Sequence, residues 1–308
     1  MAGDGAVDHV LPGLAIDPPC PIDYGELSEA LARADLVIVE NLCSLPLNPL
    51  AWKAVAEICR GRRTILHHHD LPWQRPQYSE HPPPPDDPSW LHVTINELSR
   101  EELAVRGIGA VVIYNTFSMD GPLGERGATR ELLGIGREDR LVLQPTRAIP
   151  RKNVRGGLAV AEALGATFWL LGPAEDGYGP ELDDVLARTT VPVRHGPVRD
   201  GAGSIMADAY AACDVVALPS TWEGFGNPAV ESAVHRRPLV IGRYPVSREL
   251  AAFGFRWFRT DETPELREWL ESPDDLLEHN YELARRYFSV SDLPSRIDAA
   301  MRATGWEW

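Results

Sequence analysis

Short apolar segments alternate with helical segments along most of this chain, and this alternation restricts the fold more than any other feature. The apolar segments are rich in valine, isoleucine and leucine, which is typical of strands buried on both faces of a sheet. The chain is therefore predicted to be an α/β protein with parallel sheets built from βαβ units. The expected strands are 35–40, 63–67, 91–95, 110–114, 140–145, 167–172, 191–196, 214–219 and 239–242, and the main expected helices are 24–33, 49–60, 99–106, 154–164, 204–213, 264–287 and 292–303.

Composition narrows the classes of function. With 308 residues, of which 44% are hydrophobic, the chain is long enough for two domains. The net charge of −15 argues against nonspecific nucleic-acid binding, which depends on basic side chains. No apolar run approaches the length of a membrane span, and the chain start lacks a signal-peptide pattern. The four cysteines lie apart without metal-binding spacing, so reduced thiols in a cytoplasmic protein are expected.

A polar connector, residues 117–139, separates two sets of alternating segments. We place the domain boundary within Ser118-Met-Asp-Gly-Pro122. The predicted parts of the chain are a first domain at 1–120, a second domain at 121–288 and a C-terminal helix within 289–308. The segment 191–196 contains a proline, which predicts an edge position in the second sheet.

Three consecutive histidines end a predicted strand of the first domain, in the segment His67-His-His-Asp70. Ligands of parallel sheets bind beyond the carboxyl ends of the strands, so this is a candidate site. Side chains alternate along a strand, so His67 and His69 are expected to share one face while His68 points away. Their spacing is poor for one ion and the sequence reveals no carboxylate partner, so no metal site is predicted. Simple capping of the strand is the alternative.

The segment Pro219-Ser-Thr-Trp-Glu-Gly-Phe-Gly-Asn-Pro-Ala-Val-Glu231 joins a predicted strand to a predicted helix. Asn227 is expected to be the N-cap of that helix and Pro228 its first residue. Glu223 then lies on the loop, and Glu231 lies about one turn inside the helix. The two intervening glycines let a ligand approach the backbone, and the free N–H groups of the helix start favour an anion. The segment therefore predicts a site for a phosphorylated ligand.

Two basic residues, Arg147 and Lys152, stand on the loop after the predicted strand 140–145. Two cations together with the N–H groups of a helix start can neutralise a diphosphate. Arg151 lies between them and is the weaker candidate. A solvated surface position is the alternative for each of these side chains.

These residues together resemble the E-x7-E signature of the large retaining glycosyltransferase family 4 (glycosyl transferases group 1), which includes glycogen, sucrose and phosphatidylinositol-mannoside synthases. The resemblance implies a GT-B fold, in which two Rossmann-like domains face each other across a cleft and the last helix crosses back to the first domain. It implies a hexosyltransferase that uses a nucleotide-diphosphate sugar, retains the anomeric configuration and needs no metal or other cofactor. The acceptor is expected to be a small molecule, a lipid or a glycan.

The resemblance also implies a role for each candidate residue. Arg147 and Lys152 would stabilise the leaving diphosphate, and Glu231 would bind the ribose hydroxyls. Glu223 would orient the transferred sugar and stabilise positive charge at its anomeric carbon. His69 matches the acceptor-side histidine of the family best. Further donor-site residues would be Gly224, Phe225, Gly226, Asn227, His195, Gly196 and Val198.

The start of the chain departs from the family pattern. Relatives open with a strand and a glycine-rich loop near the donor phosphates, and residues 1–120 contain neither. The short first domain is either native, trimmed, or completed by a partner chain or a second copy. Two alternatives therefore stay open: a sugar-nucleotide epimerase or phosphorylase of GT-B fold, and a noncatalytic sugar-nucleotide-binding subunit. Turnover of free donor or phosphorolysis would indicate the first, and tight nucleotide binding without turnover would indicate the second.

Overall fold

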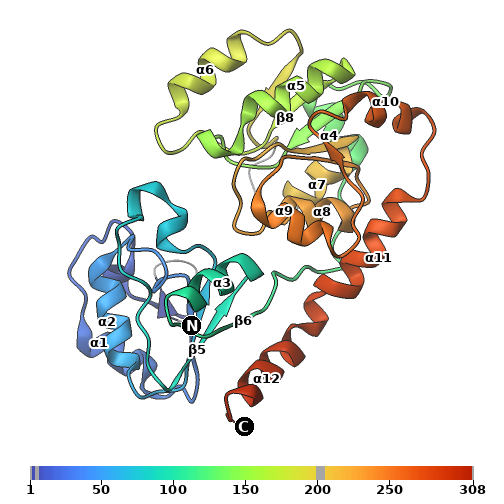
Figure 1. Cartoon of the computed structure of the whole chain (residues 1–308). Coiled ribbons are helices and arrows are strands. Elements are labelled where there is room, and N and C mark those ends of the chain that lie inside the picture. The colour runs from blue at the N-terminus through green and yellow to red at the C-terminus, as the bar shows by residue number, and fades with distance from the viewer. Residues whose placement is uncertain (1, 4–6, 199–204, 307–308) are drawn as a thin grey trace. The chain divides into compact units, whose positions relative to one another are not determined.

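The computed structural model describes residues 2–3, 7–198 and 205–306, and the chain divides into two compact units (Figure 1). Unit 1 comprises Met1–Tyr114 together with Pro294–Trp308, and unit 2 comprises Asn115–Leu293. The boundary predicted from the sequence, at residue 120, lies a few residues after the boundary between Tyr114 and Asn115 in the structure.

Unit 1 is built on a four-stranded parallel sheet with strand order β3-β4-β5-β6. Its strands are β3 (Val37–Glu40), β4 (Thr64–His68), β5 (Trp90–Thr94) and β6 (Ala110–Val112), and its helices are α1 (Tyr24–Ala32), α2 (Pro49–Cys59), α3 (Glu97–Val105) and most of α12 (Leu293–Ala303).

Helix α2 shows how the sequence sets the elements of unit 1. It starts at Pro49 because the side chain of Asn48 accepts a hydrogen bond from the Ala51 amide at 3.0 Å. Its apolar face is buried against β3, β4 and β5, and the Trp90 indole donates to the carbonyl of Cys59 at 3.0 Å. The parallel βαβ pattern expected from the sequence is therefore confirmed in this unit.

Unit 2 is built on a six-stranded parallel sheet with strand order β12-β11-β10-β7-β8-β9. Its strands are β7 (Leu141–Gln144), β8 (Thr167–Leu170), β9 (Val193–His195), β10 (Val215–Leu218), β11 (Leu239–Ile241) and β12 (Phe258–Arg259). Its helices are α4 (Arg126–Leu133), α5 (Val154–Leu164), α6 (Gly179–Ala187), α7 (Ile205–Ala212), α8 (Asn227–Val234), α9 (Pro245–Ala251), α10 (Thr263–Glu271) and α11 (Leu276–Phe288).

The strand order of unit 2 reverses direction between β7 and β10. Strands β7, β8 and β9 follow one another toward one edge, and β10, β11 and β12 follow one another toward the other edge. Strands β7 and β10 are therefore paired, with Val142 opposite Val215, although a long stretch of chain separates them. Such a switch point leaves a crevice beyond the carboxyl ends of the two strands, where α/β proteins bind ligands. The edge position expected for 191–196 is confirmed, because β9 ends the sheet.

Several expectations about helices are wrong. The segment 264–287 forms two helices, α10 and α11, because Ser272-Pro273 interrupts the helix. The connector 117–139 contains α4, and the turn expected after β11 starts α9. Helix α8 begins one residue earlier than expected, with Gly226 in the N-cap position. Ser204, expected to start a helix, lies outside the described residues.

None of the helices within the described ranges has both the length and the apolar character needed to cross a membrane.

Candidate functional site

The loops that follow β7 and β10 meet at the switch point of unit 2 and are joined by hydrogen bonds. Asn153 has a left-handed backbone (φ 49°), caps α5 by accepting from the Gly156 amide at 3.2 Å, and donates to the Pro219 carbonyl at 3.2 Å. The Thr221 amide donates to the carbonyl of Arg151 at 2.9 Å. These bonds fix the basic loop and the E-x7-E loop against each other.

Lys152 and Glu223 form a buried ion pair at this junction. The Lys152 Nζ lies 2.6 Å from Glu223 Oε1 and 2.8 Å from Glu223 Oε2, and the two side chains are only 11% and 7% exposed. Burial lowers the pKa of Lys152, and the charge of Glu223 partly opposes that shift. The structure therefore brings together two of the residues that the sequence assigned to one site.

The two arginines of the loop are placed differently from expectation. Arg147 is half exposed and its guanidinium pairs with Glu175. Arg151, the weaker candidate from the sequence, donates from Nη1 to the Trp222 carbonyl at 3.0 Å and to Glu223 Oε2 at 3.2 Å. Arg151 is therefore the second cation beside Glu223.

The start of α8 is built around Gly226, which has a positive φ of 91°. A Cβ at this position would lie 2.3 Å from the Tyr244 hydroxyl, so the tight approach requires glycine. The side chain of Asn227 accepts from the Asn115 amide group at 2.8 Å. No acidic residue occupies the first turn of α8, so its partial positive charge is free to attract an anion.

Three buried polar atoms near this helix start lack a hydrogen-bond partner among the described residues. They are the Ser220 hydroxyl, the Trp222 indole nitrogen and the Tyr244 hydroxyl. Burial raises the pKa of Tyr244, so its hydroxyl stays neutral and can donate. Buried polar groups normally have partners, and oxygen atoms of a bound ligand would supply them here. Tyr244 was not predicted from the sequence as a site residue, although it lies in the turn that follows β11.

Glu231 lies on α8 and faces α7. The Tyr210 hydroxyl donates to Glu231 Oε2 at 2.7 Å, and the Tyr210 ring stacks on His235 with ring centroids 4.7 Å apart. Burial raises the pKa of Glu231, and the hydrogen bond from Tyr210 opposes that shift. Tyr210 was also missed, because the sequence gives no sign that it supports a carboxylate on another helix.

The residues expected to form the base pocket follow β8 and β9. His195 Nε2 lies 3.1 Å from the Gly172 carbonyl, and the Gly196 carbonyl accepts from the Trp169 indole at 2.9 Å. Val198 lies just beyond β9 and is partly exposed. Phe225 is only 3% exposed, and its ring packs against Phe117 and Phe288. Its side chain is therefore part of the core of unit 2.

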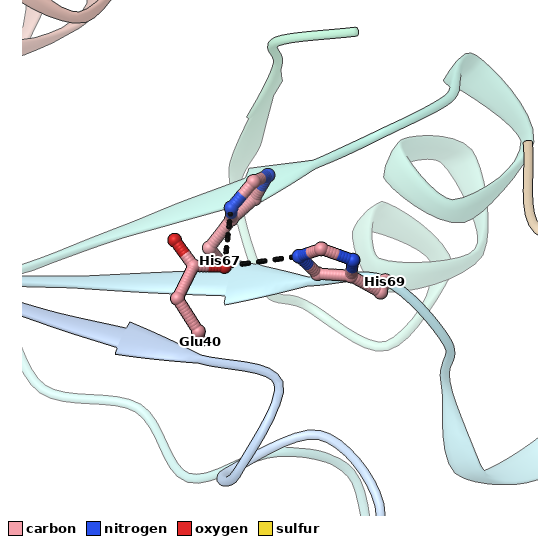
Figure 2. Close-up of side chains that lie close together, drawn as sticks. All are labelled: Glu40, His67 and His69. Atoms are coloured by element: carbon pink, nitrogen blue, oxygen red, sulfur yellow. Dashed lines mark hydrogen bonds and ion pairs between the residues drawn. The ribbon is translucent and has the colours of Figure 1, made fainter. Parts of the chain in front are cut away.

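In unit 1, Glu40, His67 and His69 converge at the carboxyl ends of β3 and β4 (Figure 2). Glu40 Oε2 lies 2.8 Å from His67 Nδ1 and 2.9 Å from His69 Nε2. Partial burial acts to raise the pKa of Glu40, but hydrogen bonds from both histidines hold it at about 2. The expectation that these histidines lack a carboxylate partner was wrong, because Glu40 reaches them from the neighbouring strand.

His68 points into the core of unit 1, as expected from strand alternation. Its Nδ1 lies 2.6 Å from the Ser44 hydroxyl oxygen, and its Nε2 lies 2.9 Å from His92 Nδ1. His92 Nε2 in turn lies 3.2 Å from Asp86 Oδ1. His68 is therefore not part of the open cluster, which leaves His67 and His69 as candidates for an acceptor-side role.

Comparison with known proteins finds a family model that matches part of the chain and two relatives of nearly 30% identity. Residues 151–265 match the family model described as glycosyl transferases group 1. The chain is 29% identical over 282 residues to mannosylglucosylglycerate synthase of Petrotoga mobilis, covering 75% of this chain and 65% of that protein. It is 28% identical to the synthase of the same name from Thermotoga maritima, in an alignment that covers 87% of this chain and 76% of the relative. The chain thus spans slightly less than two thirds of the length of the Petrotoga relative.

Solved structures show the same fold at low sequence identity. The Anabaena protein HepE, solved in complex with UDP and glucose, superposes with a TM-score of 0.69 at 17% identity, covering 91% of this chain and 81% of HepE. Sucrose-phosphate synthase from Thermosynechococcus elongatus superposes with a TM-score of 0.69 at 12% identity, covering 91% and 76% of the two chains. The expected α/β fold of GT-B type is confirmed. The chain thus has the GT-B fold, and residues 151–265, which include the ion-paired loops at the switch point of unit 2, match the glycosyl transferases group 1 model.

Proposed function

We propose that this protein transfers a hexose from a nucleotide-diphosphate sugar to an acceptor hydroxyl and retains the anomeric configuration. One observation carries the proposal: the buried contact between Lys152 and Glu223, on the loops of two strands that meet at the switch point of the sheet. A cation for the leaving group and a carboxylate for the sugar are thereby held within hydrogen-bonding distance of each other.

The leaving diphosphate would bind between the basic loop and the first turn of α8. Lys152 and Arg151, with Arg147 swinging from Glu175, would offset the negative charge that grows on the diphosphate as the glycosidic bond breaks. The amides from Gly224 to Gly226 would add hydrogen bonds to the phosphates, and no resident metal is needed for this step. The free hydroxyl of Tyr244 is a further donor for the phosphates or the sugar.

The two glutamates would act on different parts of the donor. Glu231, held by Tyr210, would accept hydrogen bonds from the ribose hydroxyls. Glu223 would orient hydroxyl groups of the hexose and stabilise positive charge at the anomeric carbon. The acceptor hydroxyl would attack from the face that the diphosphate leaves, so neither glutamate needs to form a covalent bond. His69 is the proposed acceptor-side histidine.

The relatives suggest specific substrates. HepE was solved with UDP-glucose, and the two curated relatives are named for a product that joins a mannosyl group to glucosylglycerate. We therefore propose either a glucosyl or a mannosyl donor, and a small carboxylated sugar derivative as the acceptor. A cytoplasmic location remains part of the proposal, because all four cysteines are free thiols and three of them are buried.

Thermal stabilisation by UDP, GDP, ADP and dTDP would identify the base of the donor, because a ligand that binds the folded state raises its stability. The matching glucose or mannose donor would then be incubated with glucosylglycerate, and the product's anomeric configuration read by proton NMR. Sugar transfer with retention is expected. Inversion would refute the mechanism, whereas nucleotide binding without transfer to any acceptor would favour the noncatalytic subunit.

A further inference from the structure

We propose that Glu40, His67 and His69 form a binding site for one divalent transition-metal ion of the Zn²⁺ class. The three side chains offer one carboxylate oxygen and two imidazole nitrogens, and these ligand atoms all lie within 4.8 Å of one another (Figure 2). Nothing in the family match or in the named relatives assigns a ligand to this cluster.

The fold of unit 1 places the three residues together. Strands β3 and β4 are parallel and in a register that sets Glu40 beside His67. Because side chains alternate along a strand, the residue two positions after His67 returns to the same face. His69 therefore joins His67 above the end of the sheet, while the intervening histidine is buried.

Hydrogen bonds at the strand ends fix the positions of the segments that carry Glu40, His67 and His69. Asn41 follows β3 in a left-handed conformation (φ 57°), and its amide donates to the His67 carbonyl at 2.8 Å. Its side-chain oxygen accepts from the amides of His69 and Asp70 at 3.0 and 3.3 Å. Both ligand-bearing segments are thus tied to one residue, which reduces the ordering that metal binding would require.

The distances suit a small metal ion. Zn²⁺ binds imidazole nitrogen and carboxylate oxygen at about 2.0–2.2 Å, which places the ligands of a tetrahedral site roughly 3.3 Å apart. Glu40 Oε2 now lies 2.8 Å from His67 Nδ1 and 2.9 Å from His69 Nε2, so each contact would open by about 0.5 Å. The ion would replace the two N–H protons that now point at the carboxylate, and each imidazole would carry its proton on the other ring nitrogen.

The donor set and its exposure define the kind of site. Two imidazoles and one carboxylate favour Zn²⁺ and its neighbours over Mg²⁺ or Ca²⁺, which prefer oxygen ligands. The side chains of Glu40 and His69 are 59% and 40% exposed, so the ion would keep at least one coordination position open to solvent. Three protein ligands with an open position are typical of zinc sites that bind a further ligand. The ligands of the proposed ion belong to unit 1, whereas the proposed donor-site residues belong to unit 2, and the proposed transfer needs no metal.

Titration of the metal-stripped 308-residue chain tests the proposal without any sugar substrate. Isothermal calorimetry with Zn²⁺ is expected to show one ion per chain, and Co²⁺ is expected to give the intense visible absorption of a low-coordinate site. Loss of a residue that only supports a metal ligand weakens binding about 10- to 100-fold, and loss of a ligand should cost at least that much. His67→Ala, His69→Ala and Glu40→Gln are each expected to meet that threshold.

His9→Ala is the matched control, because His9 also pairs with a glutamate, Glu26 at 3.4 Å, but belongs to no cluster of three ligand side chains among the described residues. This variant is expected to bind Zn²⁺ like the parent. The proposal is overturned if the parent binds no Zn²⁺ at micromolar concentrations, or if the His67→Ala/His69→Ala double variant keeps the parent's affinity with a native circular dichroism spectrum. Nucleotide binding, measured separately in the metal-free chain, tests the transferase proposal independently.

Discussion

The two partners of the Lys152–Glu223 pair should affect nucleoside-diphosphate affinity in opposite directions: removing the Lys152 charge should weaken binding, and removing the Glu223 charge should strengthen it. The Lys152 ammonium donates to both oxygens of Glu223, and Arg151 donates to the same carboxylate at 3.2 Å. A bound diphosphate would compete with this carboxylate for the two cations. Lys152→Met removes a ligand of the diphosphate, whereas Glu223→Gln removes its competitor.

The magnitudes follow from the burial of the pair. A hydrogen bond to a charged group contributes about 1.5–3 kcal/mol, so Lys152→Met should weaken diphosphate binding about 10- to 150-fold. Glu223→Gln should strengthen diphosphate binding by up to about tenfold. The gain is limited because burial already lowers the pKa of Lys152, and without the Glu223 charge a fraction of Lys152 loses its proton. Both variants should lose sugar transfer.

Calorimetric titration with the nucleoside diphosphate that stabilises the parent most would measure these changes at fixed pH and salt. Breaking a buried ion pair costs about 3–5 kcal/mol of folding stability, so urea unfolding should accompany each titration. Arg155→Met is the matched control, because Arg155 is a cation at the start of α5 whose side chain is 63% exposed and pairs only loosely with Glu181. It should leave affinity unchanged.

Two results would refute the reasoning. If Glu223→Gln weakens diphosphate binding as strongly as Lys152→Met, the carboxylate supports the ligand and does not compete with it. If both folded variants bind like the parent, the diphosphate does not contact Lys152 at all, and the donor site must be sought elsewhere.

Three further predictions concern stability. Burial raises the pKa of Glu231 in the folded state, so its contribution to folding stability is full below the unfolded pKa of about 4.3 and is lost as pH rises through the folded pKa. Glu231→Gln should therefore have a higher melting temperature than the parent at pH 7 but bind nucleotide more weakly. An equal or lower melting temperature would contradict this. Gly226→Ala places a Cβ 2.3 Å from the Tyr244 hydroxyl at a φ of 91°, so it should cost about 1–3 kcal/mol in urea unfolding. Burial lowers the pKa of His92, and the nearby Asp86 partly opposes that shift, so folding stability should fall as pH drops below about 6.5. The fall should be steeper in Asp86→Asn. Identical stability profiles of the two proteins against pH, measured by chemical denaturation, would count against this.

Much of the fold could be predicted because its signals are local. Strands such as β7 and β10 are short apolar runs, and each ends at a glycine, a proline or a polar loop residue. Helix α4 was missed because the segment is polar overall. Its Arg130 is only 5% exposed, and its guanidinium donates to the distant Asp214 carboxylate and Ala212 carbonyl, which the sequence cannot show. The break between α10 and α11, in contrast, was visible as Ser272-Pro273.

The candidate site divides in the same way. Lys152 and Glu223 were identified because each lies in a recognisable loop, and the structure confirms only that the two side chains meet. Glu40 was missed because its proximity to His67 depends on the register between β3 and β4. Tyr210 was missed because its contact with Glu231 depends on the packing of α7 and α8. Contacts set by register or by helix packing have no local sequence signal.

The hydrogen bonds that link the buried Ser44, His68 and His92 to the exposed Asp86 all run in one direction. An ionised carboxylate can only accept, so Asp86 requires the proton of His92 on Nε2. His92 Nδ1 must then accept from His68 Nε2, which leaves His68 Nδ1 to accept from the Ser44 hydroxyl. One carboxylate at the surface thereby sets the tautomers of two buried imidazoles. Neutralising this carboxylate would remove the constraint, and the three hydrogen bonds of the series would then be able to run in the opposite direction.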